Sequence, residues 1–250
     1  MNNSLGDRMK RQYEDRTRVM LPRRTYTIIR VDGKAFHTFT RHCEKPNDKA
    51  LAHALDGAAR RLCEEAQGAQ LAYLQSDEIS VLLTDFMLPT TDAWFDGNLQ
   101  KIVSVSASVV TAAFAAYYAG APNPNMAHFD ARVFTIPDAV EVENYFIWRQ
   151  QDATRNNIQS LAQAHFSHKQ IHGLNTSQLQ DLLFTDRGIN WNAELPYWKR
   201  GRCLLRDEIS GWLLDPDIPV FTADRAYLSS RIPRAWADQP NQPDPATAGG

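Results

Sequence analysis

Two short acidic motifs carry the clearest chemical signal in this sequence. Asp32 is followed by Gly33 at the end of a β-branched and aromatic run, and Asp77 is followed by Glu78 between two further apolar runs. Two carboxylates that are brought together repel one another unless a cation lies between them, and hard oxygen ligands suit Mg²⁺. Two such ions about 4 Å apart are the recurrent arrangement for in-line phosphoryl transfer.

The elements around these acids predict that they meet. We expect a β-α-β-β-α-β unit over residues 24–137, with an antiparallel sheet and two helices on one face, the ferredoxin-like arrangement. Its first and third strands are central neighbours, so Asp32 and Asp77 would converge at one edge. The signals for the unit are strands at 25–32, 69–74, 79–84 and 129–136 and helices at 47–66, with Asn47 as N-cap, and 94–118.

Each motif also has a plainer interpretation. An Asp-Gly pair at a strand end is often only a turn, and an acidic hairpin tip is often only solvated. Their joint occurrence in this frame favours a polymerase-like or cyclase-like palm. The backbone amides of residues 33–37, which open a short helix, could then cradle a triphosphate, and the absent side chain of Gly33 would allow a close approach.

The rest of the chain predicts a mainly helical extension. Helices are expected at 138–167 and 176–184, and strands at 201–206 and 219–223. The last residues are rich in Pro, Gln, Asn and Gly, which is typical of a disordered tail. The fold class is therefore α+β, with an expected catalytic domain at 1–137, a C-terminal domain at 138–232 and a tail at 233–250.

Composition excludes several classes of protein. With 250 residues, 43% of them hydrophobic and 22% charged, the chain is neither fully disordered nor short of core material. Its net charge of -2 excludes a general positive field for nucleic acid. The first 34 residues nevertheless carry nine Lys and Arg against four Asp and Glu. This basic segment is either a solvated helix face or a place where phosphates approach.

The sequence also bears on the compartment. The three cysteines form no C-x-x-C pair, which favours reduced thiols. The N-terminus has no apolar leader, and no apolar run approaches the roughly 18 residues of a membrane span. We therefore expect a cytoplasmic protein without a membrane partner.

Longer motifs around the acids resemble a known family. The segments RVDGKAFHTFTR, KPND (45–48) and YLQSDEIS (73–80) are similar to those of the tRNA(His) guanylyltransferase family. FDARV (129–133), WRQQDATRNN (148–157) and INWNAELPYWKRG (189–201) extend the resemblance over residues 5–225. It implies a palm-like nucleotidyltransferase that adds nucleotides to the 5′ end of tRNA in the 3′-to-5′ direction.

The chain departs from the family pattern in two places. Members that add G to tRNA(His) typically carry His-Ile-Asn-Asn where this chain has TRNN at 154–157, and an Arg where it has Asn98. The sequence resembles the guanylyltransferase-like branch, which is associated with template-directed repair of 5′-truncated tRNA. Repair and G addition to tRNA(His) both remain open.

The resemblance also implies roles for individual residues. Asp32 and Asp77 would bind two Mg²⁺ ions together with the Gly33 carbonyl, and Glu78 would be an auxiliary catalytic acid. The incoming nucleotide and its phosphates would meet Lys34, Ala35, Phe36, His37 and Ser76, while Lys45 and Asp48 would hold a triphosphate or the activated 5′ end. Contacts to RNA or triphosphate are expected from Lys101, Arg132, Arg155, Asn156, Lys199, Arg200 and Arg202, unless these are ordinary salt bridges or surface residues.

Substrates and partners follow from the same resemblance. ATP would activate a 5′-monophosphate end, GTP or another nucleoside triphosphate would be added, and tRNA would be the acceptor. A homotetramer is implied. Two rival functions share the fold: a palm-type nucleotide cyclase, and a tRNA-binding protein without catalysis. Gln75-Ser76 stands where diguanylate cyclases have Gly-Gly, and the intact Asp32 and Asp77 oppose a loss of catalysis.

Overall fold

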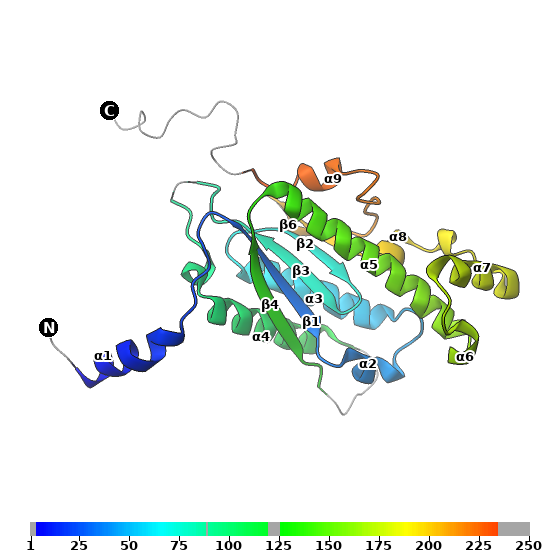
Figure 1. The fold of residues 1–250 in the computed structure, drawn as a ribbon, viewed down its shortest axis with the longest axis horizontal. Coiled ribbons are helices and arrows are strands. Elements are labelled where there is room, and N and C mark those ends of the chain that lie inside the picture. The colour runs from blue at the N-terminus through cyan, green and yellow to red at the C-terminus, as the bar shows by residue number, and fades with distance from the viewer. Residues whose placement is uncertain (1–3, 89, 120–125, 235–250) are drawn as a thin grey trace.

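A six-stranded antiparallel sheet forms the centre of the molecule (Figure 1). The computed structural model describes residues 4–88, 90–119 and 126–234. The strand order is β4-β1-β3-β2-β5-β6, so β1 and β3 are central neighbours as expected. The α+β class with an antiparallel palm-like sheet is thus confirmed. The strands are β1 Tyr26–Gly33, β2 Ala69–Gln75, β3 Glu78–Leu83, β4 Phe129–Ile136, β5 Arg202–Asp207 and β6 Gly211–Asp215.

Helices cover both faces of this sheet. The helices α3 (Lys49–Glu65) and α4 (Leu99–Tyr117) lie behind it in Figure 1, and the long α5 (Ala139–His165) lies in front. Alternate residues of β1 divide between the two cores, since successive side chains of a strand point to opposite faces. Ile29 therefore packs in the cluster with α3 and α4, and Ile28 in the cluster with α5.

Two predicted helix start positions differ from those in the structure. The N-cap of α3 is Asp48 and not Asn47, because the Asp48 carboxylate accepts the backbone N–H of Leu51. The helix predicted to start at residue 94 begins as α4 at Leu99, capped by Asn98. Residues Trp94–Gly97 form a separate 3₁₀ turn, η4, in which three residues have positive φ.

By length and composition α4 could cross a membrane. It instead packs along α3 and against the sheet, with Ile102, Val110 and Phe114 buried. This is also the environment of an apolar helix in a protein core. The expected absence of a membrane partner stays a prediction.

The C-terminal part of the chain adds two strands to the sheet. β5 pairs with β2, and β6 pairs with β5 in a hairpin. The strand predicted at 219–223 is wrong, and β6 was missed. Backbone groups there bond to side chains and not to a neighbouring strand: Gln150 donates to the Pro219 carbonyl and accepts from Phe221 N–H. The expected domain boundaries stay predictions, and residues 235–250 of the expected tail lie outside the described residues.

The remaining helices are short, apart from one. At the N-terminus, Leu5–Thr17 is a run of helical turns that extends from the body and has no buried residues (Figure 1). Helices after α5 form a smaller cluster around Leu179 and Leu183. Their bounds are α1 Leu5–Met9, η1 Lys10–Glu14, η2 Asp15–Thr17, α2 Phe36–Phe39, η3 Thr40–His42, α6 His168–Ile171, α7 Thr176–Arg187, η5 Trp191–Ala193, α8 Pro196–Arg200 and α9 Ala226–Ser229.

Candidate active site

The two acidic motifs lie at the same end of β1 and β3. Val31 of β1 is opposite Ile79 of β3, so the residues just beyond this pair, Asp32 and Asp77, lie at one edge of the sheet. A Cβ built on Gly33 would be 2.7 Å from the Asp77 Oδ2. The backbone of Gly33 therefore passes directly beside the Asp77 carboxylate, as the sequence predicted.

The electrostatics of this edge favour a cation. Burial raises the pKa of Asp77, and the charge of Asp32 raises it further, to about 6, although a hydrogen bond from the Ser76 hydroxyl at 3.0 Å opposes the shift. Within the described residues neither Asp32 nor Asp77 has an ion pair with Lys, Arg or His. Adjacent carboxylates without a cationic partner are the donor set that a divalent ion stabilises.

The donor atoms at this edge are of the type that Mg²⁺ prefers, but they are too few to fill its coordination shell. Asp32, Asp77 and the Gly33 carbonyl supply hard oxygen atoms, but no group of three or more His, Cys, Asp or Glu in the described part of the chain could hold a metal. Mg²⁺ usually binds one or two carboxylates and completes its shell with water and substrate phosphates. The site therefore fits an ion that arrives with a nucleotide.

The raised pKa of Asp77 predicts a pH dependence of the metal-free protein. The folded state holds the Asp77 proton more tightly than the unfolded state, whose pKa is near 3.8. The free energy of unfolding should therefore fall as pH rises from about 4 to about 6, and this contribution is constant above that range. Urea unfolding in EDTA, compared between the wild type and Asp77→Asn, measures it. An identical pH profile in the two proteins would contradict the assignment.

Gly33 leaves no room for a side chain. A Cβ at this position would lie 2.6 Å from Cγ of Phe36 and 2.7 Å from Asp77 Oδ2, and Phe36 is held between Phe39, Phe114 and Phe129. Gly33→Ala should cost about 1–3 kcal/mol of stability and displace the Asp77 carboxylate. Its rate of nucleotide addition should fall at least about tenfold. Gly6→Ala, whose Cβ would lie 3.8 Å from its nearest neighbour, is the control, and an unaffected Gly33→Ala rate would refute the close approach.

A cavity on one side of Asp77 contains most of the residues expected to bind the nucleotide. This cavity, called here the loop cavity, has a volume of about 710 Å³. Ala35 lies in its wall with a φ of 51°, just before α2. Lys34 lies outside the lining, and its backbone N–H donates to the His128 carbonyl. The sequence-predicted residues that line it are Gly33, Ala35, Phe36, His37, Lys45, Asp48, Ser76 and Asp77.

Asp48 lines the loop cavity and is also the N-cap of α3. Its carboxylate accepts backbone N–H groups of Leu51 at 2.9 Å and Glu44 at 3.0 Å. Burial raises the pKa of Asp48, but these hydrogen bonds outweigh that effect and hold the pKa below its ordinary value. An ionised Asp48 therefore fixes the loop between Glu44 and α3 in place.

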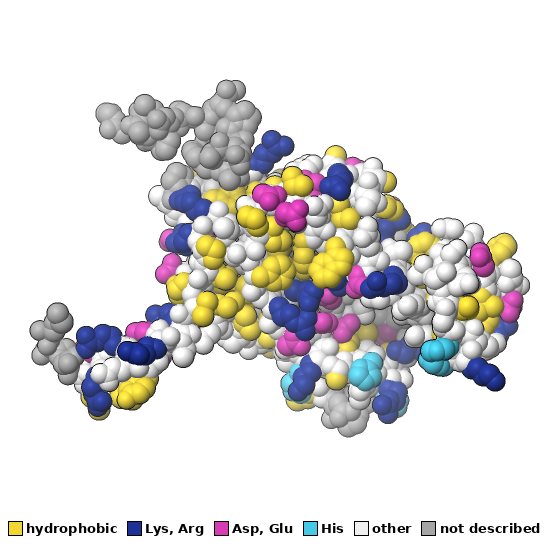
Figure 2. Space-filling view, in the orientation of Figure 1, with side chains coloured by type: hydrophobic (Ala, Val, Ile, Leu, Met, Phe, Trp, Pro, Cys, Tyr) yellow, Lys and Arg dark blue, Asp and Glu magenta, His cyan; other side chains and the backbone are white. Residues whose placement is uncertain are grey.

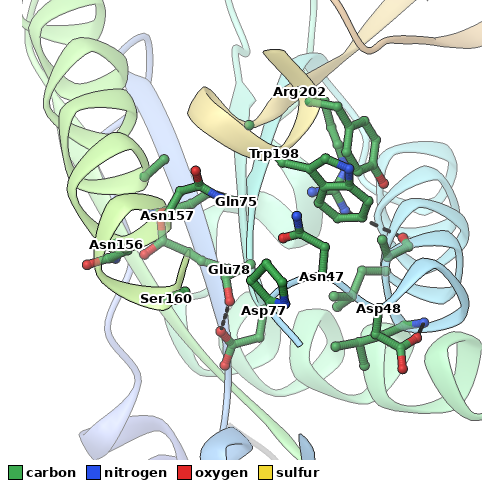
Figure 3. A pocket seen from close by; sticks show the side chains of 18 of the residues that line it. Asn47, Asp48, Gln75, Asp77, Glu78, Asn156, Asn157, Ser160, Trp198 and Arg202 are labelled. Carbon is green, nitrogen blue, oxygen red and sulfur yellow. Dashed lines mark hydrogen bonds between the residues drawn. The ribbon is translucent and has the colours of Figure 1, made fainter. Parts of the chain in front are cut away.

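A second cavity adjoins the loop cavity at Asp77 (Figure 3). This cavity, called here the amide cavity, has a volume of about 470 Å³. Asp32 and Asp77 line it, and Asp77, Ser76 and Asp48 are shared with the loop cavity. Most of its polar lining is neutral. The neutral polar and aromatic residues are Asn47, Gln75, Asn156, Asn157, Gln159, Ser160, Gln163, Tyr197 and Trp198.

Glu78 lies beside this edge and forms an ion pair with Arg149, which was not among the predicted site residues. Arg149 of α5 donates to both Glu78 carboxylate oxygens at 2.7 Å, and to Asp152 at 2.8 Å. Glu78 and Arg149 are both buried. The role of Glu78 as a catalytic acid stays a prediction, while its structural role is to anchor the hairpin to α5. The i,i+3 spacing of Arg149 and Asp152 was visible in the sequence, but nothing in it indicated Glu78 as the partner.

The cations of α8 and β5 need a correction. Lys199, Arg200 and Arg202 were expected to contact RNA or a triphosphate. In the structure Lys199 is buried, donates to the Asn192 carbonyl at 2.7 Å, and has its pKa lowered by burial. Arg202 is 2% exposed and pairs with Asp56. Arg200 is partly buried and donates to the Ile218 carbonyl at 2.9 Å. Lys199 and Arg202 therefore do not form an exposed patch, and contacts of the three residues to RNA or triphosphate stay a prediction.

The other expected contacts are spread over the molecule. Arg155 pairs with Asp152 on α5, and Asn156 donates to Asp152 at 3.2 Å. Arg132 is exposed on β4 near Asp130, and Lys101 is exposed on α4. Of these residues only Asn156 lines one of the two cavities.

Comparison with known proteins places this geometry in a family. The family profile described as tRNAHis guanylyltransferase matches residues 6–137. The tRNA(His) guanylyltransferase of Schizosaccharomyces pombe is 31% identical over 214 residues, which cover 80% of this chain and 79% of the relative.

Solved structures agree with this match. A bacterial tRNA(His) guanylyltransferase-like protein in complex with ATP is 45% identical with a TM-score of 0.86, and the match covers 92% of this chain and 99% of that one. A bacterial protein of the same description in complex with GTP is 41% identical with a TM-score of 0.78, over 92% of this chain and 99% of that one.

These similarities confirm the resemblance seen in the sequence motifs. The profile spans the four strands and two helices that position Asp32 and Asp77. The solved structures extend the likeness through β5 and β6. The prediction that the protein is a nucleotidyltransferase is confirmed with them: the chain belongs to the tRNAHis guanylyltransferase family.

Proposed function

We propose that the protein is a template-directed 3′-to-5′ nucleotidyltransferase that adds nucleotides to the 5′ end of tRNA. The observation that carries this proposal is the position of Asp32 and Asp77 at one sheet edge, where two adjoining cavities share Asp77. A reaction between a nucleoside triphosphate and an RNA end needs two substrate sites that meet at one reaction centre. A cyclase that joins nucleotides alone would not need the tRNA.

The loop cavity is the proposed triphosphate site. Part of its wall is the start of α2, where Gly33, Ala35, Phe36 and His37 line the cavity. Lys45 and His37 supply positive or titratable groups. The ATP and GTP complexes of the two similar bacterial proteins support nucleotide binding by this chain. Because positioning and charge stabilisation dominate phosphoryl transfer, the protein needs no covalent intermediate of its own.

In the proposed reaction the 3′-hydroxyl of the incoming nucleotide attacks the activated 5′ end of the tRNA. That end is a triphosphate, or a monophosphate first joined to AMP from ATP, and the leaving group is pyrophosphate or AMP. Asp32, Asp77 and the Gly33 carbonyl would hold Mg²⁺, which when bound would activate the hydroxyl and neutralise charge on the leaving group. The chain itself orients the two substrates and fixes both carboxylates.

A labelled RNA tests the proposal. A tRNA that lacks its first nucleotide and carries a 5′-triphosphate labelled at its α-phosphate is incubated with each nucleoside triphosphate in turn. Extension by one nucleotide, only with the base complementary to the opposite strand, would support template-directed repair. Extension by G alone on tRNA(His) would favour G addition. Products from nucleotides without RNA would support the rival cyclase, and no turnover with RNA present would support a non-catalytic binding protein.

The cytoplasmic location and the homotetramer belong to the proposal as well. The resemblance supports the tetramer, and the lack of a C-x-x-C pair among the three cysteines, which favours reduced thiols, supports the location. Sedimentation of the purified protein over a range of concentrations measures the assembly.

The N-terminal helical run remains a candidate for tRNA phosphates. Figure 2 shows Lys and Arg side chains along this projecting segment. Arg23, which also belongs to the basic segment of the first 34 residues, pairs with Asp85 at 2.6 Å and is left out of the proposed contacts. Lys10 and Arg16 are exposed. A Lys10→Gln, Arg16→Gln double variant should bind tRNA more weakly and reduce the slope of log affinity against log salt by about one unit for each phosphate that the variant no longer neutralises. An unchanged slope would exclude the segment.

A further inference from the structure

The amide cavity differs in chemistry from the loop cavity. Among its described lining residues the only cation is Arg202, which is already paired with Asp56. Its other charged lining residues are the acids Asp32, Asp48, Asp77 and Glu78. Without a metal ion these acids disfavour a phosphate group, whereas a neutral, flat and polar group can bind beside them.

One wall of the amide cavity is a braced aromatic pair. The Trp198 ring meets the Tyr197 ring edge-on, with centroids 4.5 Å apart, and Figure 3 shows Trp198 facing the cavity. Tyr197 donates to Asp56 at 2.7 Å, and the Arg202 guanidinium lies over its ring. These contacts hold Trp198 in place before any ligand arrives. A fixed aromatic face in a polar cavity is the platform on which nucleobases stack.

The amide cavity also supplies hydrogen-bonding groups. The side-chain amide of Asn47 projects into the cavity in Figure 3 and has no hydrogen-bond partner among the described residues. The Gln75 Nε2 lies 3.5 Å from both Glu78 and Asp152, which are weak contacts. A side-chain amide offers one acceptor and two donor hydrogens, which match the edges of a base.

We propose that the amide cavity binds a nucleobase of the RNA at its reacting end, stacked on Trp198 and contacted by Asn47. The proposal rests on the function above, in which the RNA end and the triphosphate meet at the acids. The two cavities adjoin at Asp77, so a nucleotide in each would bring their reacting groups together. The RNA base belongs in the amide cavity because this cavity supplies an aromatic face and side-chain amides, whereas the loop cavity supplies Lys45 and the backbone at the start of α2, which suit a triphosphate.

A fluorescent base measures this stacking without turnover. Two 5′-truncated tRNAs carry 2-aminopurine, one at the 5′-terminal position and one at the unpaired position opposite the gap. Each is mixed with the wild-type protein without nucleoside triphosphates. Stacking on an aromatic ring quenches 2-aminopurine, so we expect quenching of at least one probe. Trp198→Leu should abolish that quenching and weaken RNA binding about tenfold, while the KM for the nucleoside triphosphate stays unchanged.

Matched variants separate stacking from folding. Trp148→Leu changes an exposed Trp of α5 that lines neither cavity, and it should leave quenching and affinity at wild-type values. Trp198→Phe should retain part of the quenching. Asn47→Ala removes an amide that has no partner among the described residues, so it should leave the melting temperature unchanged and weaken RNA binding several-fold.

Three results would overturn the proposal. These are quenching that persists in Trp198→Leu, no quenching of either RNA probe by the wild type, and Trp198-dependent quenching of free 2-aminopurine riboside triphosphate. The last result would assign the cavity to the free nucleotide. Each can occur while the labelled tRNA is still extended, so failure here is distinct from failure of the proposed function.

Discussion

Asp32→Asn and Asp77→Asn should each lower the rate of nucleotide addition about a thousandfold or more. Both substitutions keep the shape of the side chain and remove a charged oxygen ligand at the sheet edge where the acids meet. A metal clamp supplies several kcal/mol of transition-state stabilisation, and a thousandfold loss corresponds to about 4 kcal/mol. Single-turnover extension of 5′-truncated tRNA at saturating Mg²⁺ measures the effect.

Asp130→Asn is the matched control for these two variants. Asp130 lies on β4 directly opposite Asp32 in the register, but it is exposed and lines neither cavity. Its rate should be within a few-fold of the wild type. Near-normal rates in Asp32→Asn or Asp77→Asn, with a folded protein by circular dichroism, would refute the assignment of the acids to catalysis.

Arg149→Met should destabilise the protein by about 3–5 kcal/mol. It would leave the buried Glu78 carboxylate without its two hydrogen bonds from Arg149, and removing one partner of a buried pair leaves an uncompensated charge. Urea unfolding at neutral pH measures the loss. The double variant Arg149→Met, Glu78→Gln should recover a large part of it, because no buried charge then remains unpaired.

Arg155→Met provides the comparison for Arg149. Arg155 also pairs with an acid of α5, Asp152, but its side chain is 59% exposed. Exposed ion pairs contribute roughly 0–1 kcal/mol, so the change in the free energy of unfolding should stay within that range. Equal losses in the Arg149 and Arg155 variants would mean that burial of the Glu78 pair does not govern its energy.

The central elements could be predicted from the sequence because their signals are local. β4 was expected at Phe129–Ile136 and lies there, since Pro137 ends the run. β1 combines β-branched and aromatic residues, and its apolar residues do not recur at helical spacing. In α3 the apolar residues do recur at helical spacing. The meeting of Asp32 and Asp77 then followed from topology alone.

Features that depend on distant partners could not be predicted in this way. Val220 and Phe221 are suited to a strand, yet Gln150, about 70 residues earlier, takes over the backbone bonds that a ladder would use. Lys199 and Arg202 were expected to contact RNA or triphosphate because the family resemblance implied it. Only the fold reveals that Asn192 and Asp56 hold them inside.

The pairing of β5 with β2 constrains how the chain is synthesised. Leu71 and Leu74 of β2 pair with Leu205 and Arg202, which are made about 130 residues later. A nascent chain that ends near residue 137 has the acids and both helices behind the sheet, but β2 is an unprotected edge strand. Such edges invite pairing with other chains. The amide cavity also lacks its Trp198 wall until α8 emerges from the ribosome, so binding competence follows the slow, non-local closure of the sheet.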